Sequence, residues 1–163
     1  MTRLSVEQAR QLGILPGPGP RTRQRKPSAV KINLSPTQWD AKTFPGGLWL
    51  QVPFVPPSLN DWVNWHWGKQ RRYKQDLTDA VCGLKVAMKL PKFYRATVQI
   101  IYYHSTNRRR DPADNWAPKF LMDALVQGGI LVDDNGDLVK VPPVGMEFDP
   151  GRPRTEVFVW EEK

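Results

Sequence analysis

The chain has 163 residues, with 24 lysines and arginines against 16 aspartates and glutamates, which gives a formal net charge of +8 at pH 7. This length suffices for one domain with a hydrophobic core, and the basic excess favours polyanionic partners. The single cysteine, Cys82, excludes an internal disulfide, which fits a cytoplasmic protein. No apolar run approaches the ~20 residues that a membrane span needs, so no membrane partner is expected.

Residues 1–45 are predicted to form a flexible, basic, Pro/Gly-rich extension. Ser5 and Gln8 have the spacing of a capping box and could start one short helix. The sequence LPGPGP at 15–20 excludes helix and central strand, and RTRQRK at 21–26 carries four positive charges. Such a run is most often a solvated tail, although it could add phosphate contacts. The folded domain is predicted to span 46–163.

The sequence of the first half of that domain predicts a strand, a helix and a second strand. Apolar residues predict a strand over 48–55, which Pro56 and Pro57 end. A repeat at helical spacing predicts a helix over 73–90, and the β-branched and aromatic residues over 96–104 predict a strand. The helical repeat consists of Tyr73, Leu77, Val81, Leu84 and Met88.

The second half adds one helix and two strands. Asp114 is a plausible N-cap for a helix that runs to about Gln127 and ends at two glycines. Strands are expected over 138–148 and 155–160, joined by a turn at 149–151. The order β-α-β-α-β-β predicts an α+β fold, in which two main helices pack on one face of a small mixed sheet.

Two loops of this fold carry aspartates that could meet. Asp111 and Asp114 follow the strand over 96–104, and Asp134 follows the second helix. A helix followed by a short return could bring its far loop back toward the sheet edge. Carboxylates, waters and phosphate oxygens are the ligands that Mg²⁺ prefers, and a bound ion would activate water for phosphodiester hydrolysis. The sequence therefore predicts a Mg²⁺ site, in which Mn²⁺ would substitute.

Each aspartate also has a purely structural interpretation. Asp114 could serve only as a helix N-cap. Asp133 and Asp134, with Asn135 and Gly136 behind them, could form only a tight turn. Asp123 could pair with Lys119 at the i,i+4 spacing of a helix.

The basic residues near the aspartates allow two interpretations as well. Arg108, Arg109 and Arg110 directly precede Asp111 and could neutralise it, but such clusters favour phosphate clamping. Lys119 could stabilise negative charge that develops on a phosphate, or it could be an ordinary solvated lysine. Upstream, the predicted phosphate contacts are Lys69, Arg71 and Arg72.

Three tryptophans crowd the segment before the first helix. Trp62, Trp65 or Trp67 could stack on unpaired bases. The alternative is that they pack between sheet and helix or across a dimer contact. Nearby His66 has no evident partner in the sequence.

These motifs together resemble the RusA family of Holliday junction resolvases, which phages and prophages largely encode. The resemblance covers about residues 48–160 and rests on RRRDPADN at 108–115, Lys119, DAL at 123–125, the glycines at 128 and 129, and Asp133-Asp134. The segment VPPSLN at 55–60 resembles the opening strand and turn of that family. The interval from Asp111 to Asn115 is one residue longer than the family pattern Asp-x-Asp-Asn.

The resemblance implies a Mg²⁺-dependent, homodimeric crossover junction endodeoxyribonuclease. Such an enzyme resolves four-way DNA junctions by paired symmetric nicks, in recombination and repair, here in the cytoplasm of a bacterial host. By motif position, Asp111, Asp114 and Asp134 take the metal-binding roles, and Lys119 takes the role of the catalytic lysine. The alternative is a non-catalytic or differently selective protein of the same fold that binds branched or single-stranded DNA.

Overall fold

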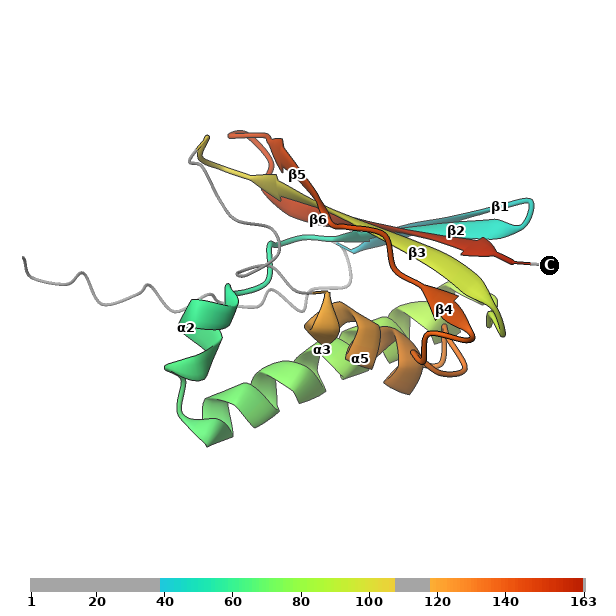
Figure 1. The fold of residues 1–163 in the computed structure, drawn as a ribbon, viewed down its shortest axis with the longest axis horizontal. Coiled ribbons are helices and arrows are strands. Elements are labelled where there is room, and N and C mark those ends of the chain that lie inside the picture. Colours follow the sequence, from blue (N-terminus) through green and yellow to red (C-terminus); the bar gives the residue numbers. More distant parts are fainter. Residues whose placement is uncertain (1–38, 108–117, 163) are drawn as a thin grey trace, which may run out of the picture.

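The computed structural model describes residues 39–107 and 118–162, and it places six strands and three helices there (Figure 1). In chain order these elements are β1 (Asp40–Phe44), β2 (Gly47–Val52), α2 (Leu59–Val63), α3 (Trp67–Met88), β3 (Ala96–His104), α5 (Lys119–Gln127), β4 (Val139–Lys140), β5 (Gly145–Phe148) and β6 (Arg154–Glu161).

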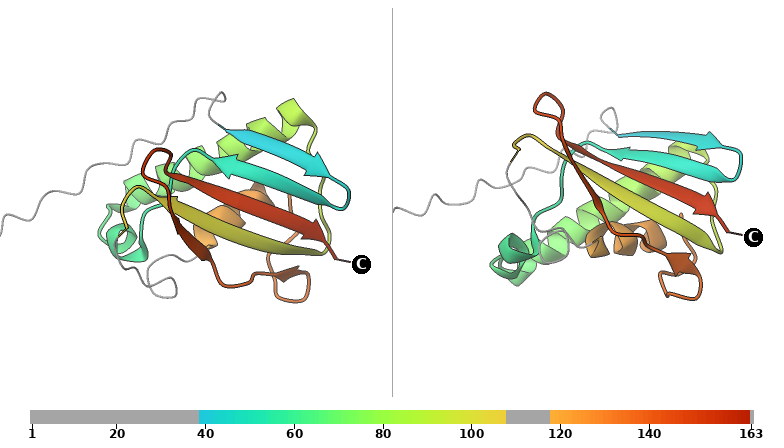
Figure 2. Two further views of the ribbon diagram at one scale, coloured as in Figure 1. Left: turned by 90° about the horizontal axis from the view of Figure 1, so that it is seen from above. Right: turned by 45° about the horizontal axis from the view of Figure 1, so that its top comes forward.

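The six strands form one mixed sheet in the order β1-β2-β6-β3-β4, and β5 also pairs with β3. The pairs β1·β2, β2·β6 and β3·β6 are antiparallel, whereas β4 and β5 lie parallel to β3. Parallel neighbours need a crossover connection, and α5 lies within the connection from β3 to β4. The three described helices lie on the same face of the sheet (Figure 2). The predicted α+β fold is confirmed.

Strand β1 lies in a segment that the sequence assigned to the extension. It forms a hairpin with β2, in which Phe44 pairs with Gly47. Gly46 takes a positive φ of 73° at the turn, a conformation that favours glycine. Because residues 1–45 were assigned to the extension, this strand was not predicted. Strand β1 is therefore part of the sheet although it precedes residue 46.

The helices begin at positions other than those predicted. Helix α3 starts at Trp67 rather than residue 73, because His66 caps it: the Nδ1 atom of His66 accepts a hydrogen bond from the amide of Gly68 at 3.2 Å. Ser58 caps the unpredicted helix α2 by accepting from the amide of Asp61 at 3.1 Å.

The second half also departs from two expectations. Helix α5 starts at Lys119, and its N-cap is Pro118 instead of Asp114. The single strand predicted over 138–148 is divided into β4 and β5, with Pro142 and Pro143 between them. Proline has no amide hydrogen to donate to a strand ladder, which explains the interruption.

The core lies between the sheet and the helices. Strand β3 alternates buried and half-buried residues over its whole length, as a strand with one covered face should. On α3, the buried residues are Tyr73, Leu77 and Val81, which confirms the predicted face over these turns. Helix α5 buries five of its nine residues against this layer, namely Phe120, Leu121, Met122, Ala124 and Leu125.

Arg154 joins two carboxylates at the end of the sheet where β6 begins. Its guanidinium donates to Asp149 Oδ2 at 2.6 Å and to Glu156 Oε1 at 2.7 Å, and it lies 3.7 Å from the centre of the Tyr103 ring. The hydrogen bond from Arg154 lowers the pKa of the Asp149 carboxyl. At the other end of β6, hydrogen bonds from Lys140 and Thr97 lower the pKa of Glu162.

The lowered pKa values of Asp149 and Glu162 lead us to expect a loss of stability in acid. A carboxyl whose pKa is lowered by folding stabilises the protein above its unfolded pKa, which is about 4, and this contribution disappears as pH falls through the folded pKa. We therefore expect the urea midpoint to fall between pH 5 and pH 3 more in the wild type than in the double variant Asp149→Asn/Glu162→Gln. Equal pH dependence of the two midpoints would contradict the assignment.

Candidate functional site

An aromatic cluster joins α2, the start of α3 and the start of α5. It consists of Trp62, Trp65, Tyr73 and Phe120. Ring centroids are 4.4 Å apart for Trp62 and Phe120, 5.5 Å for Trp62 and Trp65, and 5.6 Å for Trp65 and Tyr73. Such contacts fix the relative positions of the elements that carry them. The packing interpretation is therefore confirmed for Trp62 and Trp65, whereas Trp67 is 68 % exposed.

Three lysines surround this cluster. The Nζ atom of Lys74 lies 3.2 Å from Asp123 Oδ2, and that of Lys119 lies 3.7 Å from Asp123 Oδ1. The ammonium group of Lys69 lies 3.4 Å from the centre of the Trp65 ring, within the range of a cation–π contact. Two ammonium groups thus share one carboxylate, so the site keeps a positive charge. We call this arrangement of Lys69, Lys74, Lys119 and Asp123 the lysine cluster.

The N-terminus of α5 adds to the positive potential of the lysine cluster. Its N-cap, Pro118, provides no side-chain acceptor, and the first turn contains no acidic residue. The N-terminus of a helix carries partial positive charge on its first amides and favours anions. Lys119 is the first residue of this helix, with its side chain 66 % exposed.

Burial of the aromatic cluster affects one of its members directly. Burial raises the pKa of Tyr73, so its hydroxyl stays protonated at neutral pH. That hydroxyl is buried without a hydrogen-bond partner among the described residues. Tyr73 therefore acts here as a packing residue.

The predicted site residues fall in three places. Arg108, Arg109, Arg110, Asp111 and Asp114 lie outside the described residues. Lys69, Arg71 and Arg72 are exposed on the first turns of α3, and Lys119 starts α5. Asp134 lies in the connection from α5 to β4, after the end of α5 opposite Lys119. Since a helix of nine residues is about 14 Å long, the structure does not bring Asp134 and Lys119 together.

The loop that contains Asp134 is a tight turn held by its own side chains. Asp133 Oδ1 accepts from the amide of Asp134 at 2.8 Å, and Asn135 Oδ1 accepts from the amide of Asp137 at 3.0 Å. The structural interpretation of Asp133 and Asn135 is thus confirmed. Asp134 itself is exposed. Over residues 39–107 and 118–162, no three His, Cys, Asp or Glu side chains are grouped to hold a metal ion.

Lys74 is the one member of the lysine cluster that the sequence analysis did not single out. It contacts Asp123 across 49 positions of sequence. The i,i+4 rule finds Lys119 for Asp123 within one helix, but no local rule finds a partner on another helix. The packing of α3 against α5 alone brings Lys74 to this carboxylate.

No protein-family model and no curated protein matches this chain. Among solved structures, it is similar to the periplasmic domain of Helicobacter pylori MotB (residues 90–256), with a TM-score of 0.43, 14 % identity, and coverage of 82 % of this chain and 86 % of that one. A second MotB periplasmic domain (residues 64–256) has a TM-score of 0.43 and 13 % identity, over 100 % of this chain and 87 % of that one. Likeness at this level transfers no function to the chain.

These comparisons contradict the predicted membership of the RusA family. No family model matches the chain, and the two solved structures named above are periplasmic domains of MotB. We therefore withdraw the junction-resolving endonuclease, the branched-DNA partner and homodimer, and the alternative of a DNA-binding protein of that fold. The predicted cytoplasmic location is withdrawn with them; the two similar structures are periplasmic domains of MotB, and a likeness at this level assigns no location to this chain.

A membrane span was not expected from the sequence. Within the part of the chain that the structure describes, no helix combines the length and apolarity needed to cross a membrane.

Proposed function

We propose that the lysine cluster binds a phosphate-bearing ligand. The observation that carries this proposal is that Lys74 and Lys119 share the single carboxylate of Asp123, at 3.2 and 3.7 Å. One carboxylate cannot neutralise two ammonium groups, and the N-terminus of α5, which no described side chain caps, adds partial positive charge beside them. Phosphate groups, with several acceptor oxygens and negative charge, suit such a site.

The aromatic cluster makes the cationic site rigid. Trp62 and Tyr73 lie against Phe120, the second residue of α5, at 4.4 and 6.1 Å between ring centroids. The backbones that carry Lys69, Lys74 and Lys119 are thus held before a ligand arrives, which reduces the entropy that binding would cost. A solvated lysine on an isolated surface helix would not have its backbone fixed by such aromatic packing.

Mg²⁺ binding also remains a proposal. Asp111 and Asp114 lie seven and four residues before Pro118 in the chain. Mg²⁺ commonly combines one or two carboxylates with waters and phosphate oxygens of the ligand. The position of Asp134 behind the far end of α5 makes it the weakest of the three candidate ligands. Mn²⁺ should substitute, since it accepts the same oxygen ligands.

The anion site is tested by calorimetric titration with inorganic tripolyphosphate at low ionic strength. We expect Lys74→Ala or Lys119→Ala to weaken binding by about tenfold, equivalent to about 1.4 kcal/mol. Lys92→Ala is the matched control, because Lys92 is an exposed lysine outside the lysine cluster. Equal affinity of wild type, Lys74→Ala and Lys119→Ala would refute the proposal.

The metal site is tested separately by Mn²⁺ titration followed by electron paramagnetic resonance. We expect Asp111→Asn and Asp114→Asn each to weaken Mn²⁺ binding at least about tenfold, and Asp134→Asn to leave it unchanged. A loss of affinity in Asp134→Asn as large as in the other two variants would show that the loop after α5 also reaches the ion.

A further inference from the structure

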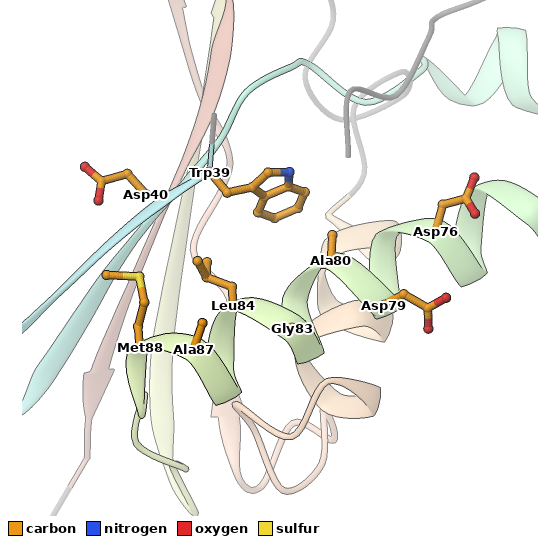
Figure 3. Close-up of a pocket in the computed structure, with 9 residues that line it drawn as sticks. All are labelled: Trp39, Asp40, Asp76, Asp79, Ala80, Gly83, Leu84, Ala87 and Met88. Atoms are coloured by element: carbon orange, nitrogen blue, oxygen red, sulfur yellow. The ribbon is translucent and has the colours of Figure 1, made fainter. Parts of the chain in front are cut away.

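A groove with an apolar floor runs between the start of β1 and one side of α3. It has a volume of about 550 Å³, and Ala80, Gly83, Leu84, Ala87 and Met88 form its floor on α3. Figure 3 shows Trp39, the residue before β1, on the opposite wall. A Cβ atom added at Gly83 would meet nothing within 4 Å, so the floor is open at this point.

Acidic residues lie at the edges of the groove. Asp40, Asp76 and Asp79 line the groove, and none of them forms a salt bridge with a described residue. The buried indole N–H of Trp39 also lacks a hydrogen-bond partner in the described part of the chain. The groove therefore offers an apolar surface and one donor, with three carboxylates at its edges, which suit a basic segment that also carries apolar side chains and backbone carbonyls.

The chain itself contains a segment of this chemistry directly before the groove. Residues 21–34 read RTRQRKPSAVKINL, with basic residues first and Val30, Ile32 and Leu34 after them. Trp39 is both part of the groove wall and joined to this segment through residues 35–38. The floor from Asp76 to Met88 is about 18 Å long, and six extended residues span about 20 Å. The segment is thus long enough to follow the floor.

We propose that the groove binds residues 21–34 of the same chain as an intramolecular docking site. The apolar side chains lie on the floor of α3, and the arginines and lysines lie against Asp40, Asp76 and Asp79. The covalent connection at Trp39 gives the segment an effective concentration in the millimolar range, so modest contacts suffice for docking in cis. Because the charge–charge contacts of the segment with the groove are screened by salt, docking should weaken at high salt.

The test uses the full-length chain in two measurements. The first is the rate of tryptic cleavage within residues 21–31, read by mass spectrometry, since the protease cuts only the undocked fraction. The groove variant combines Asp40→Asn, Asp76→Asn and Asp79→Asn. We expect it to be cut roughly tenfold faster than the wild type. A control with the same change of charge, Glu147→Gln, Asp137→Asn and Glu161→Gln, removes three exposed acids elsewhere and should be cut at the wild-type rate.

The second measurement is the methyl spectrum of protein labelled with ¹³C at its four methionines. Met88 is 43 % exposed at the groove, whereas Met122 is buried in the core at 4 % and serves as an internal reference. Replacement of Arg21, Arg23, Arg25 and Lys26 by alanine should shift the Met88 signal and leave that of Met122 in place. Added salt should move the wild-type Met88 signal in the same direction.

Two results would overturn the proposal. The first is the absence of the expected change in either measurement, namely an equal cleavage rate in the wild type and the groove variant or an unchanged Met88 signal after replacement of the four basic residues. The second is a dependence of either measurement on protein concentration, because the groove would then be filled by a second molecule and not in cis.

Discussion

Leu77→Ala is expected to lower the free energy of unfolding by about 2–5 kcal/mol, the usual range for a leucine removed from a core. Leu77 lies on the buried face of α3 and is fully buried, with 0 % exposure. The substitution removes apolar contacts and leaves a cavity that the sheet and α5 can fill only in part. Urea unfolding followed by circular dichroism measures the effect.

Val86→Ala is the matched control for this loss. Val86 belongs to the same helix but is 74 % exposed, so its truncation should change stability by less than about 0.5 kcal/mol. A similar loss of stability in both variants would mean that α3 does not present the face that the structure assigns to the core.

Gly128→Ala is expected to destabilise the protein by about 1–3 kcal/mol, the usual cost of overpacking. A Cβ atom at this position would lie 2.6 Å from Val81 Cγ1 and 2.7 Å from the carbonyl oxygen of Ala124. Both contacts are closer than real Cβ atoms allow, and the second is with backbone. The φ of Gly128 is −74°, so the expected loss comes from the clashes with Val81 of α3 and with the Ala124 carbonyl of α5, and not from a positive φ.

The same substitution at Gly83 should have the opposite effect. Gly83 lies inside α3, and an added Cβ would meet no atom within 4 Å. Alanine is favoured over glycine in a helix interior by about 0.5–1 kcal/mol, so Gly83→Ala should be more stable than the wild type. Thermal unfolding of both variants beside the wild type measures the difference. A stabilised Gly128→Ala would show that the two helices are not packed as closely as described.

Local sequence patterns determined several elements correctly. The strand over 96–104 matches β3 at both ends, because β-branched and aromatic residues alternate there between a covered and an open face. The apolar repeat at Tyr73, Leu77 and Val81 identified the buried side of α3. These features depend on residues that are close together in the sequence, so the sequence pattern alone predicts them.

Positions that depend on distant contacts or on caps were predicted less well. The starts of α3 and α5 depend on His66 and Pro118, and neither was recognised as a cap. Met88 continues the apolar repeat but remains exposed, because at this end α3 borders the groove beside Trp39. An apolar repeat indicates a side of a helix, but it does not show how far the facing layer extends.

The sequence by itself determined the α+β class, strand β3, the buried side of helix α3 and the i,i+4 pair of Lys119 with Asp123. The tertiary structure alone decided that Lys74 reaches the same carboxylate from α3, that β1 completes the sheet, and that α5 separates Asp134 from Lys119. The physical reason is that residue periodicity records local geometry, whereas the meeting of distant side chains depends on how helices and strands pack against one another.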